Sequence, residues 1–150
     1  LITPGRATAL VQATPQAADA PNVRYLPAGT QLQFDEMLWA CDLNFVRGED
    51  SLVRAIWSGK PFIWQIYPQE DHAHHAKLTA CLDWLDAPDS LRRAHALWNG
   101  IATLDETLPW PVPDNTVLDA WKQCVQAARH RLQTQPSLTE QLMAFAVEKG

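Results

Sequence analysis

The chain has 150 residues, of which 47% are hydrophobic; this favours one domain with a buried core and argues against overall disorder. Its formal net charge of −5 argues against a nonspecific nucleic-acid binder, because such a protein needs a basic face. No apolar run approaches the roughly 20 residues of a membrane span, and no signal-peptide pattern is present. We therefore expect a cytoplasmic protein that binds neither nucleic acid nor membrane.

The first part of the chain mixes short apolar runs with helical periods. We expect strand segments at 1–3 and 23–26, helices over 6–14 and from Thr30 or Gln31 to about 40, and a loop over 15–22. The chain opens on LITPGRA, which is typical of the end of a strand. We therefore expect it to begin inside a larger protein.

A strand, a turn, a helix and a second strand follow. Residues 43–46 predict a short buried strand, 47–50 a turn, and 51–58 a helix that stops at Gly59. Residues 61–67 (PFIWQIY) are apolar nearly throughout, as in a parallel strand covered on both faces. The alternation predicts an α/β fold with a parallel sheet and right-handed crossovers.

Helices dominate after Pro68. We expect them over 72–86, 88–101 (capped by Asp89 or Ser90), 114–133 and 137–149 (with a Ser137–Glu140 capping box), and a proline-rich connection over 104–113. The whole chain therefore predicts a nucleotide-binding type of α/β half followed by a helical tail.

The turn within NFVRGEDSLVRA, residues 44–55, has two interpretations. As an anion site, it offers backbone N–H groups near Asp50 and Ser51, the Ser51 hydroxyl and the Arg47 guanidinium, with Gly48 allowing a tight backbone. As a plain helix start, Asp50 or Ser51 caps the helix, the acids complement its dipole, and Arg47 pairs with Glu49. The pattern alone favours the plain helix start, since a lone glycine is no phosphate-binding motif.

Other candidate chemistry is weaker. The HAHH run at 72–75, beside Glu70 and Asp71, has no third ligand at a diagnostic spacing, which indicates a solvated helix start rather than a metal site. His95 and His130 stand alone on helices and carry no assigned role.

The three cysteines also predict no chemistry. Cys41, Cys81 and Cys124 show no zinc or redox spacing, and Cys41 has no acid–histidine partner in sequence that would make it a nucleophile. We expect buried free thiols in a reducing cytosol.

Three further residues, Gln31, Phe34 and Tyr67, could recognise a nucleobase. The amide of Gln31 could bond a pyrimidine edge, and Phe34 or Tyr67 could stack on its face. The alternative is that Phe34 belongs to the core and that Tyr67 merely ends a strand.

The stretch from Met37 to Gln69, beginning MLWACDLNF and including the RGEDS turn, Gly-Lys-Pro, a strand and YPQ, resembles the bacterial elongation factor P arginine rhamnosyltransferases. TPGRA near the start and SLTEQLMAFAVEKG at the end fit as well, so the resemblance covers essentially the whole chain. It implies a GT-B fold, in which two Rossmann-like domains face a cleft. It also implies metal-independent, inverting transfer of rhamnose from dTDP-β-L-rhamnose to an arginine guanidine of elongation factor P.

By this resemblance, residues 1–150 are the C-terminal, donor-binding domain, incomplete at its start. The N-terminal acceptor domain with its aspartates is absent, so we expect no turnover by this chain alone. No cofactor is implied. The resemblance assigns donor-site roles to eight residues, with Glu49 the best local candidate for catalysis: Gln31, Phe34, Arg47, Gly48, Glu49, Asp50, Ser51 and Tyr67.

The chain departs from the family pattern at Ala28, where an aromatic residue is expected three residues before Gln31. Base stacking would then depend on Phe34 alone, or the loop over 27–30 is displaced. Two alternatives stay open at this point. The chain could be the donor domain of another GT-B transferase that uses a UDP or GDP sugar, or a non-catalytic α/β domain that binds proteins through its tryptophans.

Overall fold

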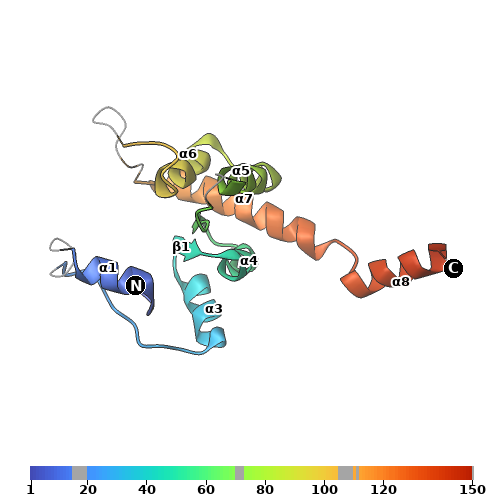
Figure 1. The fold of residues 1–150 in the computed structure, drawn as a ribbon, viewed down its shortest axis with the longest axis horizontal. Coiled ribbons are helices and arrows are strands. Elements are labelled where there is room, and N and C mark those ends of the chain that lie inside the picture. The colour runs from blue at the N-terminus through green and yellow to red at the C-terminus, as the bar shows by residue number, and fades with distance from the viewer. Residues whose placement is uncertain (15–19, 70–72, 105–109, 111, 150) are drawn as a thin grey trace. The chain divides into compact units, whose positions relative to one another are not determined.

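The computed structural model describes residues 1–14, 20–69, 73–104, 110 and 112–149. Contacts divide the chain into two compact units, Leu1–Glu36 and Met37–Gly150, and each is described by itself. The elements (Figure 1) are α1 (Arg6–Gln12), α3 (Gln31–Ala40), β1 (Asn44–Arg47), α4 (Glu49–Ser58), β2 (Phe62–Gln65), α5 (Ala73–Leu85), α6 (Asp89–Trp98), α7 (Asn115–Gln133) and α8 (Leu138–Lys149).

The first unit brings the two predicted strand segments together. Ile2 and Tyr25 form an isolated parallel bridge, in which the Ile2 N–H donates to the carbonyl of Arg24 at 2.8 Å. At the start of α3, the Thr30 N–H donates to Gln33 Oε1 and the Gln33 N–H donates to Thr30 Oγ1. This reciprocal capping box fixes the predicted helix start at residues 30–31.

The second unit contains the predicted strand–helix–strand arrangement. Strands β1 and β2 are parallel, with Asn44 opposite Phe62 and Arg47 opposite Gln65. Strand β2 is buried on both faces, as predicted, but β1 alternates between buried and exposed residues. The prediction of a short buried first strand was therefore correct for one face only: Phe45 on the other face is half-exposed, and its ring contacts those of two tryptophans, Trp98 and Trp110.

Side chains of α6 and of its C-cap residue, Asn99, occupy the second edge of β2. The Trp64 N–H donates to His95 Nε2 at 3.0 Å, and the Ile66 N–H donates to Asn99 Oδ1 at 3.0 Å. Asn99 Nδ2 in turn donates to the Trp64 carbonyl at 2.9 Å. Because His95 Nε2 accepts, Nδ1 carries the proton and donates to the Leu91 carbonyl. The sequence assigned no role to His95. In the structure its side chain accepts a backbone hydrogen bond that a neighbouring strand would otherwise accept.

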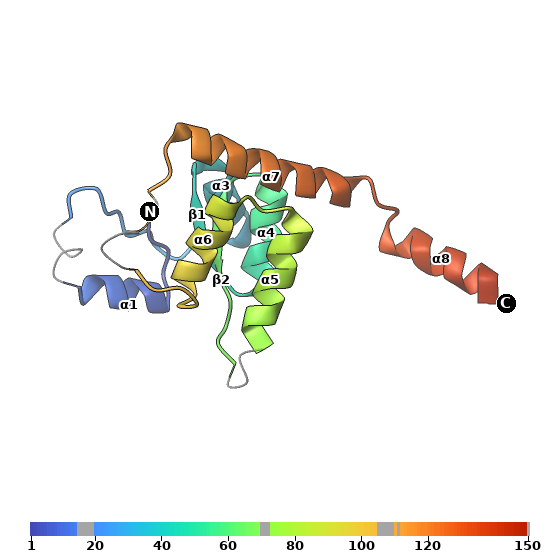
Figure 2. The same ribbon diagram turned by 90° about the horizontal axis from the view of Figure 1, so that it is seen from above.

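Helix α7 packs against α4 and α5 and supplies donors to their C-terminal ends (Figure 2). Arg129 Nη1 lies 3.3 Å from the carbonyl of Trp57, in the last turn of α4. Arg131 donates to the Trp84 carbonyl near the end of α5, and Cys124 Sγ donates to the Leu85 carbonyl at 3.2 Å. Cations at these ends also interact favourably with the helix dipoles.

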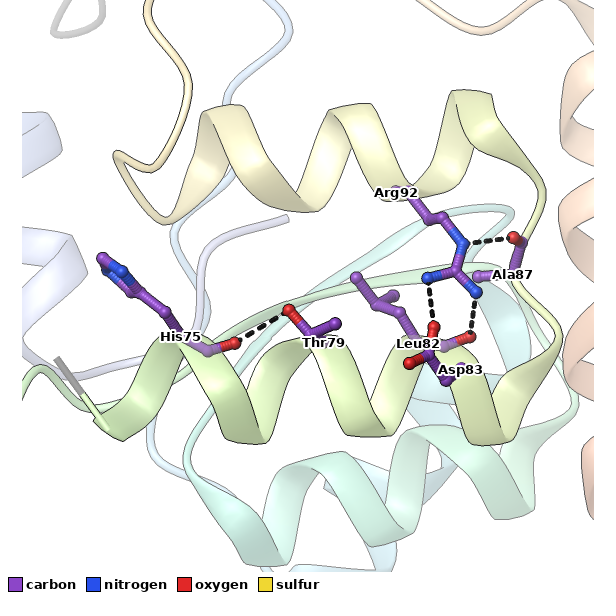
Figure 3. Close-up of polar contacts among 6 residues, drawn as sticks. All are labelled: His75, Thr79, Leu82, Asp83, Ala87 and Arg92. Atoms are coloured by element: carbon purple, nitrogen blue, oxygen red, sulfur yellow. Dashed lines mark hydrogen bonds and ion pairs between the residues drawn. The ribbon is translucent and has the colours of Figure 1, made fainter.

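The remaining carbonyls at the end of α5 are paired locally. Asp86 has a left-handed φ of 55°, so its N–H bonds the Asp83 carbonyl and the Ala87 N–H bonds the Leu82 carbonyl, a Schellman arrangement. Arg92 Nη1 lies 2.6 Å from Asp83 Oδ1, while its other nitrogens donate to the carbonyls of Leu82 and Ala87 (Figure 3). One arginine therefore joins the end of α5 to α6.

Most other boundaries agree with the sequence. Gly59 ends α4 with a left-handed φ of 67°, Asp114 caps α7, and Ser137 and Glu140 form the predicted capping box of α8. The N-cap of α6 is Pro88 without a side-chain bond, so the caps predicted at Asp89 or Ser90 were wrong. Among the described residues, no helix is long and apolar enough to span a membrane.

We predict that acidification destabilises the fold through His95. Burial lowers the pKa of His95 from 6.5 to about 4, so the folded state favours the neutral ring. This stabilisation is complete above pH 6.5 and is lost as the pH falls toward 4, a change of about 3 kcal/mol. Urea unfolding of the protein at pH 7 and pH 4.5 measures it.

The variant His95→Ala should lose that pH-dependent component and also cost about 1–3 kcal/mol at pH 7, because the Trp64 N–H loses its acceptor. The variant His130→Ala, at an exposed histidine of α7, is the control and should retain the wild-type pH dependence. An unchanged pH dependence in His95→Ala would contradict the assignment.

Candidate functional site

The turn between β1 and α4 is built on Gly48. This residue is the N-cap of α4 with φ of 82°, a conformation that favours glycine. Its N–H donates to the Gln65 carbonyl of β2 at 3.3 Å. Its carbonyl accepts from the Leu52 N–H and from Trp64 Nε1, both at 3.1 Å. The turn is therefore fixed by backbone and indole bonds to the sheet.

The first turn of α4 leaves its backbone donors open. Within the described part of the chain, the N–H groups of Glu49, Asp50 and Ser51 have no acceptor, and no side chain caps the helix. The predicted caps at Asp50 or Ser51 were therefore wrong. An unpaired first turn next to a tight glycine backbone is the arrangement in which helix N-termini bind anions.

Arg47 is oriented by an aromatic ring. Its guanidinium carbon lies 5.0 Å from the centroid of the half-exposed Tyr67 ring, a cation–π contact. The predicted pair between Arg47 and Glu49 does not form among the described residues. The same ring closes over the turn: a Cβ at Gly48 would lie 3.0 Å from Tyr67 Cε2 and 3.1 Å from its hydroxyl. Arg47, Gly48 and Tyr67 are thus brought together.

The side chains of the two acids in the turn, Glu49 and Asp50, do not cap α4. Asp50 Oδ2 lies 2.9 Å from Arg54 Nε, one turn along the same helix, and its side chain is 76% exposed. A surface pair of this kind contributes little to stability, but it balances the charge of Asp50. Glu49 is exposed and makes no ion pair with a described residue.

The two residues expected to contact the base lie on the first turns of α3, in the first unit. Gln31 is the first residue of the helix and is exposed, whereas Phe34 is partly buried and donates its N–H to the Thr30 carbonyl. Gln31 is thus accessible to solvent, and Phe34 is accessible in part.

Among the described residues, the histidine run forms no metal site. Glu70, Asp71 and His72 lie outside the described residues, and no group of three potential ligands occurs among the others. His74 is buried rather than solvated as predicted, and its Nδ1 accepts from the Gln69 N–H at 3.0 Å.

The cysteines are free, as predicted, but they are only partly buried, so the prediction of buried thiols was correct only in part. Burial raises the pKa of Cys81 to about 11 and also raises that of Cys124, which keeps both thiols protonated at neutral pH. Protonated thiols are poor nucleophiles, so Cys81 and Cys124 are unsuited to nucleophilic chemistry at neutral pH.

Trp64 is the residue that sequence reasoning missed. It is 4% exposed, and its indole reaches from β2 to the Gly48 carbonyl of the turn. A buried tryptophan needs a partner for its N–H, so an indole in the strand paired with the turn was the available signal.

We predict that Gly48→Ala is more costly than Gly100→Ala. Both glycines have positive φ, of 82° and 70°, but a Cβ at Gly100 would meet nothing within 4 Å. We expect Gly100→Ala to cost about 1 kcal/mol of unfolding free energy, and Gly48→Ala about 2–3 kcal/mol, since it adds a clash with Tyr67. Combining Gly48→Ala with Tyr67→Ala should remove the part of the excess caused by the ring, whereas the part caused by the backbone conformation of Gly48 (φ 82°, ψ 169°) should persist. Equal costs in the two single variants would show that the ring contact is unimportant.

The chain matches a known family along nearly its whole length. A model of the family described as Elongation-Factor P (EF-P) rhamnosyltransferase EarP matches residues 2–147. A solved structure described as the structural basis for EarP-mediated arginine glycosylation of translation elongation factor EF-P is 27% identical, with a TM-score of 0.68. That likeness covers 97% of this chain and 50% of the solved chain.

Curated relatives agree with this match. A protein-arginine rhamnosyltransferase of Pseudomonas aeruginosa is 38% identical over 136 residues, which are 85% of this chain and 35% of the relative. A protein-arginine rhamnosyltransferase of Pseudomonas putida is 38% identical over 84% of this chain and 34% of the relative. A protein-arginine rhamnosyltransferase of Shewanella oneidensis is 62% identical over 55 residues, which are 37% of this chain and 14% of the relative. The chain thus spans about a third of the length of the Pseudomonas relatives. It belongs to the EarP family of elongation factor P rhamnosyltransferases.

Proposed function

We propose that these residues form the nucleotide-sugar-binding part of a protein-arginine rhamnosyltransferase, the C-terminal half of a GT-B enzyme. The observation that carries the proposal is the first turn of α4, where three backbone N–H groups are open beside an arginine held on Tyr67. In a member of this family, the ligand that fits such a site is the diphosphate of dTDP-β-L-rhamnose.

The diphosphate is the leaving group, and the turn is suited to its charge. The open N–H groups of Glu49, Asp50 and Ser51 lie at the positive end of the helix dipole. The Ser51 hydroxyl and the Arg47 guanidinium would add two further donors. These groups can stabilise the negative charge that develops on the leaving oxygen without a metal ion, so we propose a metal-independent reaction.

The transfer itself forms a bond between a guanidine nitrogen and C1 of rhamnose while the bond from C1 to the diphosphate breaks. Attack from the face opposite the leaving group inverts C1, dTDP leaves with the bonding electron pair, and a carboxylate takes the guanidinium proton. Glu49 is exposed beside the anion site and unpaired among the described residues, so it is available to orient the sugar hydroxyls or the guanidine. The aspartates of an N-terminal acceptor domain would supply the other carboxylates.

Thymine recognition is assigned to α3. The exposed amide of Gln31 can bond the pyrimidine edge, and the accessible part of Phe34 can stack on its face. Ala28 offers no ring, so we propose that stacking depends on Phe34. The acceptor is elongation factor P, and both substrates meet in the cytoplasm.

We predict that Arg47→Ala weakens dTDP binding by about 10- to 100-fold, the range expected for a lost hydrogen bond to a charged group. Asp50→Ala should weaken it less, because Asp50 acts through the pair with Arg54 rather than on the phosphate. Isothermal titration calorimetry with dTDP measures both. Lys122→Ala is the control, since it also removes one positive charge but lies exposed on α7.

Unchanged affinity in both Arg47→Ala and Asp50→Ala would refute the site. Competition with UDP distinguishes this enzyme from another nucleotide-sugar transferase, because a dTDP-specific site should prefer dTDP. A failure of the wild-type protein to bind any nucleotide would favour the non-catalytic interaction domain.

We also predict that residues 1–150 alone transfer no rhamnose, because they span only about a third of the length of the Pseudomonas rhamnosyltransferases. Mass spectrometry of elongation factor P incubated with dTDP-β-L-rhamnose and the chain tests this, with a full-length family member as the positive control. Rhamnosylated elongation factor P in the sample with the chain alone would contradict the proposal that transfer also requires an N-terminal acceptor domain.

A further inference from the structure

Trp64 is held on two sides and itself holds the turn. Its N–H donates to His95 Nε2 and its carbonyl accepts from Asn99 Nδ2, so α6 fixes its backbone. Its indole Nε1 then donates to the Gly48 carbonyl at 3.1 Å across the sheet. With 4% of its surface exposed, Trp64 is a buried link between α6 and the proposed anion site.

The bond to Gly48 controls a backbone donor. In a trans peptide, the C=O of one residue and the N–H of the next point in opposite directions within one plane. Every described peptide bond here is trans, so the direction of the Gly48 carbonyl sets the direction of the Glu49 N–H. The carbonyl is bound on one side by the Leu52 N–H of the helix and on the other by the Trp64 indole.

We infer that Trp64 is a positioning residue for the anion site: its indole orients the Gly48–Glu49 peptide so that the Glu49 N–H faces the bound diphosphate. This inference rests on the proposed function. Trp64 contacts no substrate, and it acts by removing the freedom of the peptide before the ligand arrives. Preorganised donors of this kind bind charge more tightly than donors that must turn toward it.

The structure offers a matched control. Trp121 is also fully buried, and its Nε1 donates to Ser90 Oγ at 2.9 Å, between α7 and α6. The variants Trp64→Phe and Trp121→Phe each delete one indole hydrogen bond and a similar volume. Only Trp64→Phe frees the Gly48 carbonyl, so the comparison separates orientation of the turn from general loosening of the core.

The experiment titrates each variant with dTDP and with thymidine, which lacks the phosphates. We expect Trp64→Phe to weaken dTDP binding about fivefold relative to Trp121→Phe, the effect of one intramolecular hydrogen bond. Thymidine affinity should be the same in both variants, because the base contacts lie on α3. Equal loss of dTDP affinity in the two variants, or a parallel loss of thymidine affinity in Trp64→Phe alone, would overturn the inference.

A second measurement reports on the peptide without ligand. Residual dipolar couplings of the Glu49 N–H should change in Trp64→Phe and stay as in the wild type in Trp121→Phe. Unchanged couplings in Trp64→Phe would overturn the positioning role whatever the protein binds. If the couplings change in Trp64→Phe but the wild-type protein binds no dTDP, the positioning role stands and the proposed function fails, so the two failures are distinguishable.

Discussion

The second unit depends on how β2 satisfies its outer edge. A parallel strand has N–H and C=O groups on both edges, and β1 pairs with only one of them. At the other edge, the His95 and Asn99 side chains bond the N–H groups of Trp64 and Ile66 and the carbonyl of Trp64. Their spacing of four residues places them one helical turn apart on the same face of α6. A helix therefore finishes the sheet at this edge, and the neutral state of one histidine is part of that closure.

The two ends of the helices around the sheet differ in how many side chains bond their backbone groups. Arginines of α6 and α7 bond the C-terminal carbonyls of α4 and α5, and a thiol completes the end of α5. The N-terminal end of α4 receives no comparable partner among the described residues. Side-chain caps typically contribute about 1 kcal/mol. Helix α6 also begins without a side-chain cap, at Pro88, so the feature that distinguishes α4 is the Arg47–Tyr67 pair beside its open first turn.

Local rules predicted the elements well because their signals are short in sequence. Gly59, the Ser137–Glu140 capping box and the apolar run of β2 each specify their structure within a few residues. The surroundings of Phe45 and the role of His95 depend on contacts between the two strands and α6, which join residues about 30 to 50 positions apart in sequence. No periodicity carries that information. The GT-B architecture and the base-contacting role of Gln31 and Phe34 came from the family resemblance and stay predictions.

The acidic turn raises the question of how a phosphate could lie beside Glu49 and Asp50. The structure resolves half of this conflict, because Asp50 is paired with Arg54 and directed along its own helix. Backbone donors and side chains leave a helix start in different directions, so an anion can meet the N–H groups of residues whose carboxylates it does not approach. Under the proposed function, the exposed Glu49 would lie beside the anion rather than on it, near the sugar attached to that anion. An acid at this place is compatible with phosphate binding and would attract the guanidinium of the proposed acceptor.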